Sequence, residues 1–210
     1  MEHIKTTWKE LALNYTDDLR LTATLWAEIE KAYSDKKRHY HNLSHLKYMI
    51  EKALEYMDLL SDPDIVMFSI FYHDVVYKTI RQDNEQKSAD IAKDRLSRLG
   101  VPGDKISRCL NQIMATKKHS GNTNTDTNYF VDFDLGILGD TPENYMEYTK
   151  KIRKEYSIYP DFLYKKGRKK VLQHFLNMER IFKTDAFYKK YEEQARENLK
   201  TELKGLSSSI

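Results

Sequence analysis

Apolar residues recur along the chain at the three- and four-residue spacing that is typical of amphipathic helices. A clear example begins at residue 46, where Leu46, Met49, Ile50 and Ala53 share one predicted helix face. No segment shows the run of β-branched residues that is typical of strands. The 210 residues include only seven Gly and four Pro, so few positions interrupt the helical pattern. The pattern predicts an all-α protein of about eight to ten helices.

Residues that favour helix ends divide this pattern into elements. Asn42 or Ser44 is placed to cap a helix, Asp62-Pro63 begins another, and Gly100 follows the last apolar position of a third. Further helices are predicted over 105–116, 143–156, 162–182 and 185–203, with a polar loop over 117–128. The length suits one domain over 1–210, with residues 1–35 as a helical extension packed on it and residues 205–210 as a frayed tail.

Charge and composition narrow the functional classes. There are 35 basic and 32 acidic residues, and this balance argues against specific nucleic-acid binding. The single cysteine, Cys109, excludes a disulfide within the chain and a cysteine-based zinc site. No apolar run is long enough to cross a bilayer, and the charged N-terminal segment has no signal-peptide core. We therefore expect a cytoplasmic protein that does not bind membranes.

Histidine and aspartate residues gather in three short segments of this helical sequence. His45, the adjacent pair His73-Asp74, and Asp134 offer two imidazoles and two carboxylates. This donor set suits Mn²⁺, Fe²⁺, Co²⁺, Ni²⁺ or Zn²⁺. The pair lies in the apolar run 65–77, where a carboxylate buried without a partner is costly, and a metal ion would remove that cost. The alternative is that the pair is the polar end of a core helix and is neutralised by Lys or Arg.

Seven short motifs occur in a fixed order within the segment from about Arg38 to Leu203. They are RHYHNLSH, FYHDVVY, DNEQKSA, ATKKH, DFDLGILG, IRKEY and GRKKVL. Together they resemble a family of small bacterial proteins known as predicted metal-dependent hydrolases of the HD superfamily. The resemblance implies an HD-type helical bundle with a divalent ion in its core. It also implies hydrolysis of a phosphoester by water that the ion activates.

The resemblance assigns metal ligands residue by residue. His45 matches the first ligand, and His73 and Asp74 match the His-Asp pair. The last ligand matches Asp134, with Asp132 as its rival. On a helix these two aspartates would point about 200° apart, so only one would reach the ion. We expect Asp134 to bind the metal and Asp132 to contact the other ligands or to cap a helix.

Two further residues are candidates for proton transfer. His41 lies four residues before His45, in the segment YHNLSH, which resembles the matching segment of the cyclic-nucleotide phosphodiesterases. The resemblance implies that His41 protonates the leaving oxygen. The alternative for His41 is a hydrogen bond that orients the loop backbone. Glu85 is a candidate to accept a proton from water, and it equally suits the first turn of a helix, where the helix dipole favours an acid.

Five residues are candidates to contact the substrate. Lys117 and His119 would neutralise phosphate charge, or would simply face the negative end of a helix dipole. His119 is also a candidate ligand of a second ion. Arg38 and Arg153 offer paired donors to phosphate, with salt bridges to neighbouring helices as the alternative. Tyr77 is a candidate to stack on a base, with core packing as the alternative.

These features predict a metal-dependent phosphohydrolase that acts on a nucleotide or another small phosphorylated metabolite. The expected cofactor is one divalent ion (Mn, Fe, Co, Ni, Zn or Mg), and a second ion is left open. The nucleotide rests on the resemblance alone, because no base-recognition motif is present. One rival is a non-catalytic metal- or nucleotide-binding module, and another is a lyase or oxygenase with a second iron near His119 and Glu85. A homodimer is also left open.

Overall fold

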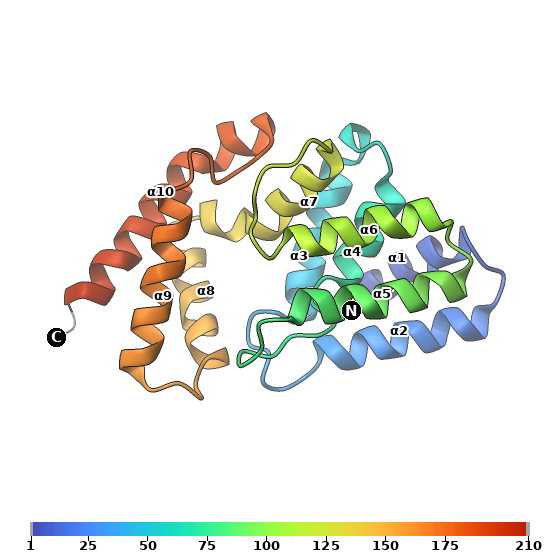
Figure 1. Ribbon diagram of the computed structural model, residues 1–210, viewed down its shortest axis with the longest axis horizontal. Helices are drawn as coiled ribbons and strands as arrows, with labels where there is room; N and C mark the ends of the chain where they lie inside the picture. The colour runs from blue at the N-terminus through green and yellow to red at the C-terminus, as the bar shows by residue number, and fades with distance from the viewer. Residues whose placement is uncertain (1, 209–210) are drawn as a thin grey trace.

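Helices account for all the regular structure of residues 2–208, the part of the chain that this computed structural model describes. The α-helices are α1 (Glu2–Leu13), α2 (Leu19–Tyr33), α3 (Leu43–Glu55), α4 (Pro63–Tyr72), α5 (Asn84–Leu99), α6 (Gly103–Ala115), α7 (Thr125–Leu135), α8 (Pro142–Glu155), α9 (Asp161–Leu176) and α10 (Asp185–Ser208). Two short 3-10 helices are η1 (Met57–Leu59) and η2 (Gly136–Gly139). This arrangement confirms the predicted all-α class and helix number (Figure 1). Within residues 2–208, no helix has the length and apolar content that are needed to cross a bilayer.

Local capping sets the helix ends that the sequence predicted. At the start of α3 the side chain of Asn42 accepts a hydrogen bond from the backbone N–H of Ser44 at 2.9 Å. Asp62 precedes Pro63, the first residue of α4, as predicted. Gly100 ends α5 with a φ of 83°, a left-handed conformation that glycine adopts without steric cost. These boundaries therefore follow from short-range chemistry.

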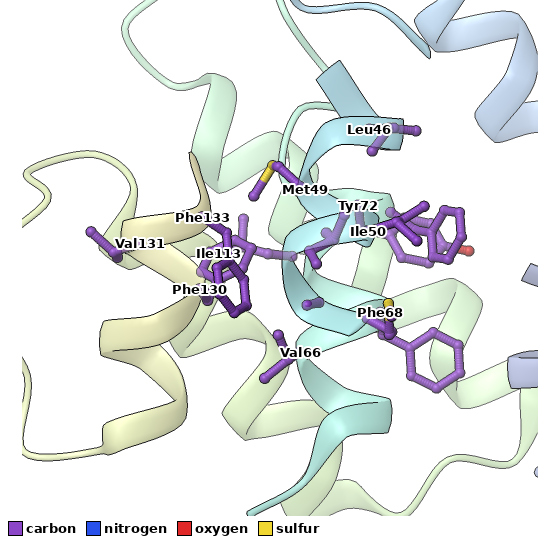
Figure 2. Packing of buried hydrophobic residues seen from close by; sticks show 14 of the residues in the cluster. Leu46, Met49, Ile50, Val66, Phe68, Tyr72, Ile113, Phe130, Val131 and Phe133 are labelled. Carbon is purple, nitrogen blue, oxygen red and sulfur yellow. The ribbon is translucent and has the colours of Figure 1, made fainter. Parts of the chain in front are cut away.

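The central helix of the bundle is α4, in which every residue from Ile65 to Tyr72 is buried. It packs against α3, α5, α6 and α7. Figure 2 shows side chains of α3, α4, α6 and α7 that form the shared core. The ring of Trp8 in α1 packs edge-on against Phe71, with the ring centroids 5.2 Å apart. A single cluster of buried apolar side chains extends from Ile4 in α1 to Leu199 in α10.

The last three helices lie together beside this bundle. Figure 1 shows α8, α9 and α10 next to one another, and α10 packs against α9 and against η2. Two glycines of η2 allow close approaches. A Cβ on Gly139 would lie 2.6 Å from the carbonyl oxygen of Tyr191 in α10, and a Cβ on Gly136 would overlap the hydroxyl of Tyr48. The DFDLGILG motif thus brings the chain close to α10.

We expect Gly139→Ala to destabilise the protein by about 1–3 kcal/mol, the usual cost of overpacking a close contact. The added methyl group would meet backbone atoms of α10, which cannot rotate away. Gly167→Ala in α9 is a matched control, because a Cβ there meets no atom within 4 Å. Alanine also favours a helix interior by about 0.5–1 kcal/mol, so this control should be slightly more stable. Urea unfolding measures both, and a Gly139→Ala variant as stable as the wild type would contradict this account.

Helix α4 is shorter than the apolar pattern predicted. It ends at Tyr72, so His73 is its C-terminal cap and Asp74 lies in the following turn. The backbone N–H of Asp74 donates to the hydroxyl of Tyr33 at 3.1 Å, and its carbonyl accepts from Arg38 at 2.7 Å. These tertiary hydrogen bonds replace those that a longer helix would supply.

Two boundaries near the C-terminus also differ from the prediction. α9 ends at Leu176 rather than at residue 182, and the backbone N–H groups of Ile181 and Phe182 donate to the carboxylate of Glu192 instead of to helix carbonyls. Residues 205–210 were predicted to fray, but α10 continues to Ser208 because Leu206 packs against the core. Residues 209–210 lie outside the described part of the chain.

Candidate metal centre

His73 presents one ring nitrogen to a polar cluster at the C-terminal end of α4. The residue is 2% exposed, and its Nδ1 lies 2.8 Å from the carbonyl oxygen of Ile70. Because a carbonyl oxygen only accepts hydrogen bonds, Nδ1 must carry a proton. Nε2 is then the nitrogen that is available to a metal ion. The fold therefore sets the orientation of this ring.

Three other residues bring electron-rich atoms to the Nε2 of His73. The Nε2 of His45 and the Oδ2 of Asp74 each lie 3.3 Å from it. The Oδ1 of Asp134 lies 3.2 Å from the Nε2 of His45 and 4.0 Å from that of His73. Ligand atoms of His45, His73 and Asp74 all lie within 4.8 Å of one another. The four residues predicted as ligands are thus neighbours, although α3, α4, the turn after α4, and α7 supply them.

This arrangement of two imidazoles and two carboxylates fits a divalent cation. Carboxylates that are removed from water need a positive partner. In the described part of the chain, no Lys or Arg side chain pairs with the carboxylate of Asp74 or Asp134, whose partners are histidines. The structure therefore does not support the alternative in which Lys or Arg neutralises the pair. The nitrogen and oxygen donors suit Mn²⁺, Fe²⁺, Co²⁺, Ni²⁺ or Zn²⁺.

Protons compete with a metal ion for the two imidazoles. Burial lowers the pKa of His73, but the charges of Asp74 and Asp134 outweigh burial and raise this pKa to about 9. Burial dominates at His45, where it holds the pKa below the usual value, and the Nδ1 of this ring has no hydrogen-bond partner among residues 2–208. Because a metal ion would displace the proton of His73, metal affinity is expected to fall as the pH decreases.

The two aspartates of the DFD segment point in different directions, as the helical repeat predicts. Asp134 contacts the cluster. Asp132 is fully buried and accepts hydrogen bonds from the backbone N–H groups of Lys183 (2.7 Å) and Thr184 (2.8 Å) and from the Thr184 hydroxyl (2.7 Å). Asp132 therefore holds the residues that precede α10. This geometry favours Asp134 as the ligand and gives Asp132 a structural contact.

His41 lies just before α3, where a buried carboxylate holds it. The Nδ1 of His41 is 2.7 Å from the Oε2 of Glu155, while the Oε1 accepts from the backbone N–H groups of Tyr40 and His41 at 2.7 and 2.9 Å. The ring stacks on Tyr77, with the centroids 4.1 Å apart. Burial lowers the pKa of His41, but the hydrogen bond to Glu155 and the nearby negative charges outweigh burial, so this pKa lies above 6.5. Nε2 is the nitrogen left for a ligand.

Glu155 is the main site residue that the sequence prediction missed. The prediction instead chose Arg153 from the same motif, because a guanidinium suits phosphate. Arg153 lies in the last turn of α8, where its guanidinium is 2.6 Å from the carboxylate of Asp161 and donates to two backbone carbonyls of the turn between α8 and α9. The signal for Glu155 was its position three residues after Ile152, on the buried face of a highly charged helix.

Arg38 forms hydrogen bonds with the backbone of the site. It is not among the residues that line the cavity beside the site. Its guanidinium donates to the carbonyl oxygens of Asp74 at 2.7 Å, Val75 at 3.2 Å and His41 at 3.3 Å. The predicted contact of Arg38 with the substrate is therefore not supported, because its donors bond the chain itself. By bonding both segments, Arg38 fixes His41 relative to Asp74.

A cavity of about 690 Å³ opens beside the metal cluster. Its size lies within the range of about 300–1,000 Å³ that is usual for small-ligand sites. His73, Asp74 and Asp134 line one part of it, and residues 163–175 of α9 contribute to another. The other predicted site residues that line it are His41, Tyr77, Glu85, Lys117 and His119. A ligand in this cavity would thus meet three of the four candidate metal ligands and most of the candidate contact residues.

Glu85 lies at the start of α5, and Lys117 and His119 lie in the turn that follows α6. The Nε2 of His119 lies 3.1 Å from the Oδ2 of Asp134, so His119 contacts a predicted metal ligand. His119 has a φ of 49°, a left-handed conformation that is uncommon for residues other than glycine. Lys117 donates to the carbonyl oxygen of Gln82 at 3.3 Å, and Glu85 lies half-buried in the first turn of α5. The structure brings all three to the cavity.

Comparison with known proteins adds no further constraint on this site. No family model, no curated protein and no solved structure matches the chain. The functional interpretation therefore depends on the residues and their geometry.

Proposed function

We propose that the protein is a metal-dependent hydrolase of the HD type that cleaves a phosphoester of a nucleotide or another small phosphorylated metabolite. The observation that carries this proposal is the convergence of His45, His73, Asp74 and Asp134 at the edge of a ligand-sized cavity. When bound, a divalent ion lowers the pKa of water and offsets charge on phosphoryl oxygens. The order of the motifs along the chain supports the same conclusion.

The side chains around the cluster suit the proton transfers that hydrolysis requires. In this reaction the oxygen of water bonds to phosphorus, the ester P–O bond breaks, and the leaving oxygen gains a proton. His41 is placed to donate that proton from Nε2, because Glu155 holds its Nδ1 and favours the protonated ring. Glu85 is the carboxylate in the lining that is not a predicted ligand, so it is placed to accept a proton from water. Lys117 offers positive charge to the phosphate.

Metal loading followed by a phosphoester screen tests this proposal. The protein is stripped with a chelator and loaded separately with Mn²⁺, Fe²⁺, Co²⁺, Ni²⁺, Zn²⁺ or Mg²⁺. We expect binding of one ion per chain and a rise in Tm, because a ligand that binds only the folded state at 100 times its Kd adds about 2.7 kcal/mol. We also expect release of phosphate from at least one nucleotide or sugar phosphate.

His73→Ala is the matched control for this screen. It removes one nitrogen ligand, so the bound ion, the rise in Tm and the turnover should disappear together. A wild-type protein that binds metal and retains a nucleotide without hydrolysing any phosphoester would contradict the proposal and would favour a sensor. A His73→Ala variant that keeps the ion would show that the ligand assignment is wrong.

A further inference from the structure

Tyrosine rings line much of the cavity beside the metal cluster. Six of the 15 tyrosines in the chain line this one cavity. They are Tyr40, Tyr77, Tyr148, Tyr156, Tyr159 and Tyr164. They come from the loop before α3, the turn after α4, and the segment that forms α8, α9 and the turn between them. The fold gathers these rings from distant segments of the sequence.

The rings form a path from the cluster to α9. His41, beside the cluster, stacks on Tyr77 with the ring centroids 4.1 Å apart. Tyr77 and Tyr156 both line the cavity. The ring of Tyr156 is followed by those of Tyr159 and Tyr164, with centroids 6.1 and 6.2 Å from its own. A ligand whose phosphate lies at the cluster would therefore have aromatic faces beside its organic part.

Several polar groups along this path are already bonded to the protein. The hydroxyl of Tyr77 donates to Glu155 at 3.2 Å, and that of Tyr159 donates to a backbone carbonyl at 3.3 Å. Arg168, which also lines the cavity, forms paired hydrogen bonds with Glu202 at 2.8 and 3.0 Å. The lining of the cavity is more apolar than polar. It therefore favours an apolar planar group over a polyol, whose hydroxyl groups would lose water and gain few partners.

Gly167 on α9 keeps this space open. A Cβ at this position would meet no atom within 4 Å, and its φ is not in the left-handed region, so the fold does not require glycine here. Glycine is also less favourable than alanine inside a helix. Tyr164, three residues earlier, and Val171, four residues later, line the same cavity, so this helix face borders it. The absence of a side chain enlarges the cavity beside the tyrosine rings.

We propose that this cavity selects phosphoesters whose organic group carries a planar aromatic ring, which packs among the tyrosine rings beside Gly167. This inference rests on the proposed function, because it places the phosphate at the metal cluster. The volume of about 690 Å³ is far more than a phosphate group alone fills, and ring faces bind planar groups by stacking. In the reaction, the oxygen of water bonds to phosphorus, and the ring-bearing alcohol leaves with a proton on its ester oxygen.

Two phosphoesters with the same type of leaving group test the selectivity. Adenosine 5′-monophosphate and ribose 5-phosphate both release a primary alcohol, and they differ in the aromatic base. For the metal-loaded protein we expect kcat/KM to be at least about tenfold higher for the adenosine ester, within the range for stacking of one base. Calorimetric titration with phenylphosphonate and methylphosphonate, which are not hydrolysed, gives a second readout. The Kd should be about tenfold lower for phenylphosphonate.

Gly167→Leu tests the place where the ring packs. The added side chain would occupy the open space, so both preferences should fall to within about twofold. Gly103→Leu is the matched control, because a Cβ at this glycine also meets no atom within 4 Å, but the residue lies in α6 outside the cavity lining. It should leave both preferences unchanged. Circular dichroism checks that both variants keep their helix content.

The outcomes separate this inference from the proposed function. Equal kcat/KM for the two nucleotide-related esters together with equal Kd for the two phosphonates would overturn the inference and leave hydrolysis standing. Preferences that survive Gly167→Leu would overturn it as well. A phenylphosphonate preference that Gly167→Leu removes would support the inference even if no ester were hydrolysed, in which case the proposed function would fail. If the protein prefers phenylphosphonate but does not prefer the adenosine ester, the inference is supported for an aromatic ring that is smaller than a nucleobase.

Discussion

Asp134→Asn is expected to abolish stoichiometric metal binding and to leave the protein folded. The Oδ1 of Asp134 lies 3.2 Å from the Nε2 of His45, and an amide replaces this anionic oxygen with a neutral, weaker donor. Loss of a residue that only contacts a metal ligand already costs about 10- to 100-fold in affinity, so loss of a ligand should cost more. Within the described residues its side chain bonds histidines and no backbone group, so the helices should stay intact, and the metal-free protein should lose stability through the lost pairing with these histidines.

Asp132→Asn, two residues before Asp134, should lower the stability of the protein and leave metal binding intact. The carboxylate of Asp132 accepts three hydrogen bonds from Lys183 and Thr184. An amide in this place would turn an N–H group towards donors and leave one of them unpaired. A buried unpaired donor costs about 1–3 kcal/mol and a lost hydrogen bond to a charged group about 1.5–3 kcal/mol, so the free energy of unfolding should fall by about 3 kcal/mol. Metal binding should persist.

Two measurements distinguish these variants. Elemental analysis after dialysis against Mn²⁺ or Zn²⁺ gives the metal content, and urea unfolding of the metal-free protein gives the stability. Loss of the ion from Asp132→Asn with retention in Asp134→Asn would show that the ligand assignment is reversed. Loss of the ion from both variants, with normal stability in both, would contradict the structural contact described for Asp132.

His41→Ala is expected to lower kcat for alkyl phosphoesters by about 10²- to 10⁴-fold, the usual contribution of a positioned acid. His41 lines the cavity, and Glu155 holds its Nδ1 at 2.7 Å, so Nε2 is the nitrogen free to protonate a leaving oxygen. A p-nitrophenyl phosphoester releases p-nitrophenolate, which leaves without being protonated. The kcat for this ester should therefore fall much less. Equal losses for both esters would indicate that His41 only orients the loop.

Glu155→Gln is expected to move the alkaline limb of the pH–kcat profile to lower pH. The pKa of His41 lies above 6.5, because the hydrogen bond to Glu155 and the nearby negative charges outweigh burial. Activity that needs the protonated ring is present below this pKa and is lost as the pH rises through it. The neutral Gln removes the nearest negative charge, so the pKa falls.

The profile is measured below the Tm of the variant, since Glu155 also holds the backbone N–H groups of Tyr40 and His41. A lower Tm with an unmoved alkaline limb would mean that Glu155 acts only as a structural contact.

Local sequence chemistry predicted much of the fold. Asn42 is followed by a helix whose first turn it caps, Pro63 begins α4, and Gly100 ends α5 in a left-handed conformation. These signals act over a few residues, so they can be recognised without tertiary information. The same is true of the direction of Asp132 and Asp134, since the helical repeat alone separates them by about 200°.

The partners of the site residues were less predictable. Glu155 bonds the backbone of Tyr40, 115 residues earlier, and Arg38 bonds carbonyl oxygens 36 and 37 residues later. Arg153 bonds a backbone carbonyl of the turn that follows α8 and the carboxylate of Asp161, although its motif and charge suited a phosphate. Each of these side chains has a chemistry that permits several partners, and residue type alone does not choose among them.

The sequence by itself determined the helical class, most helix starts, and the set of imidazoles and carboxylates that we propose as ligands of a divalent ion. Those features depend on periodicity, capping and donor type, which are properties of a residue and its near neighbours. Only the tertiary structure decided where α4 ends, that a buried Glu155 holds His41, and that six tyrosines surround one cavity. Such contacts join segments far apart in the chain, and they exist because packing around the buried helix α4 brings those segments together.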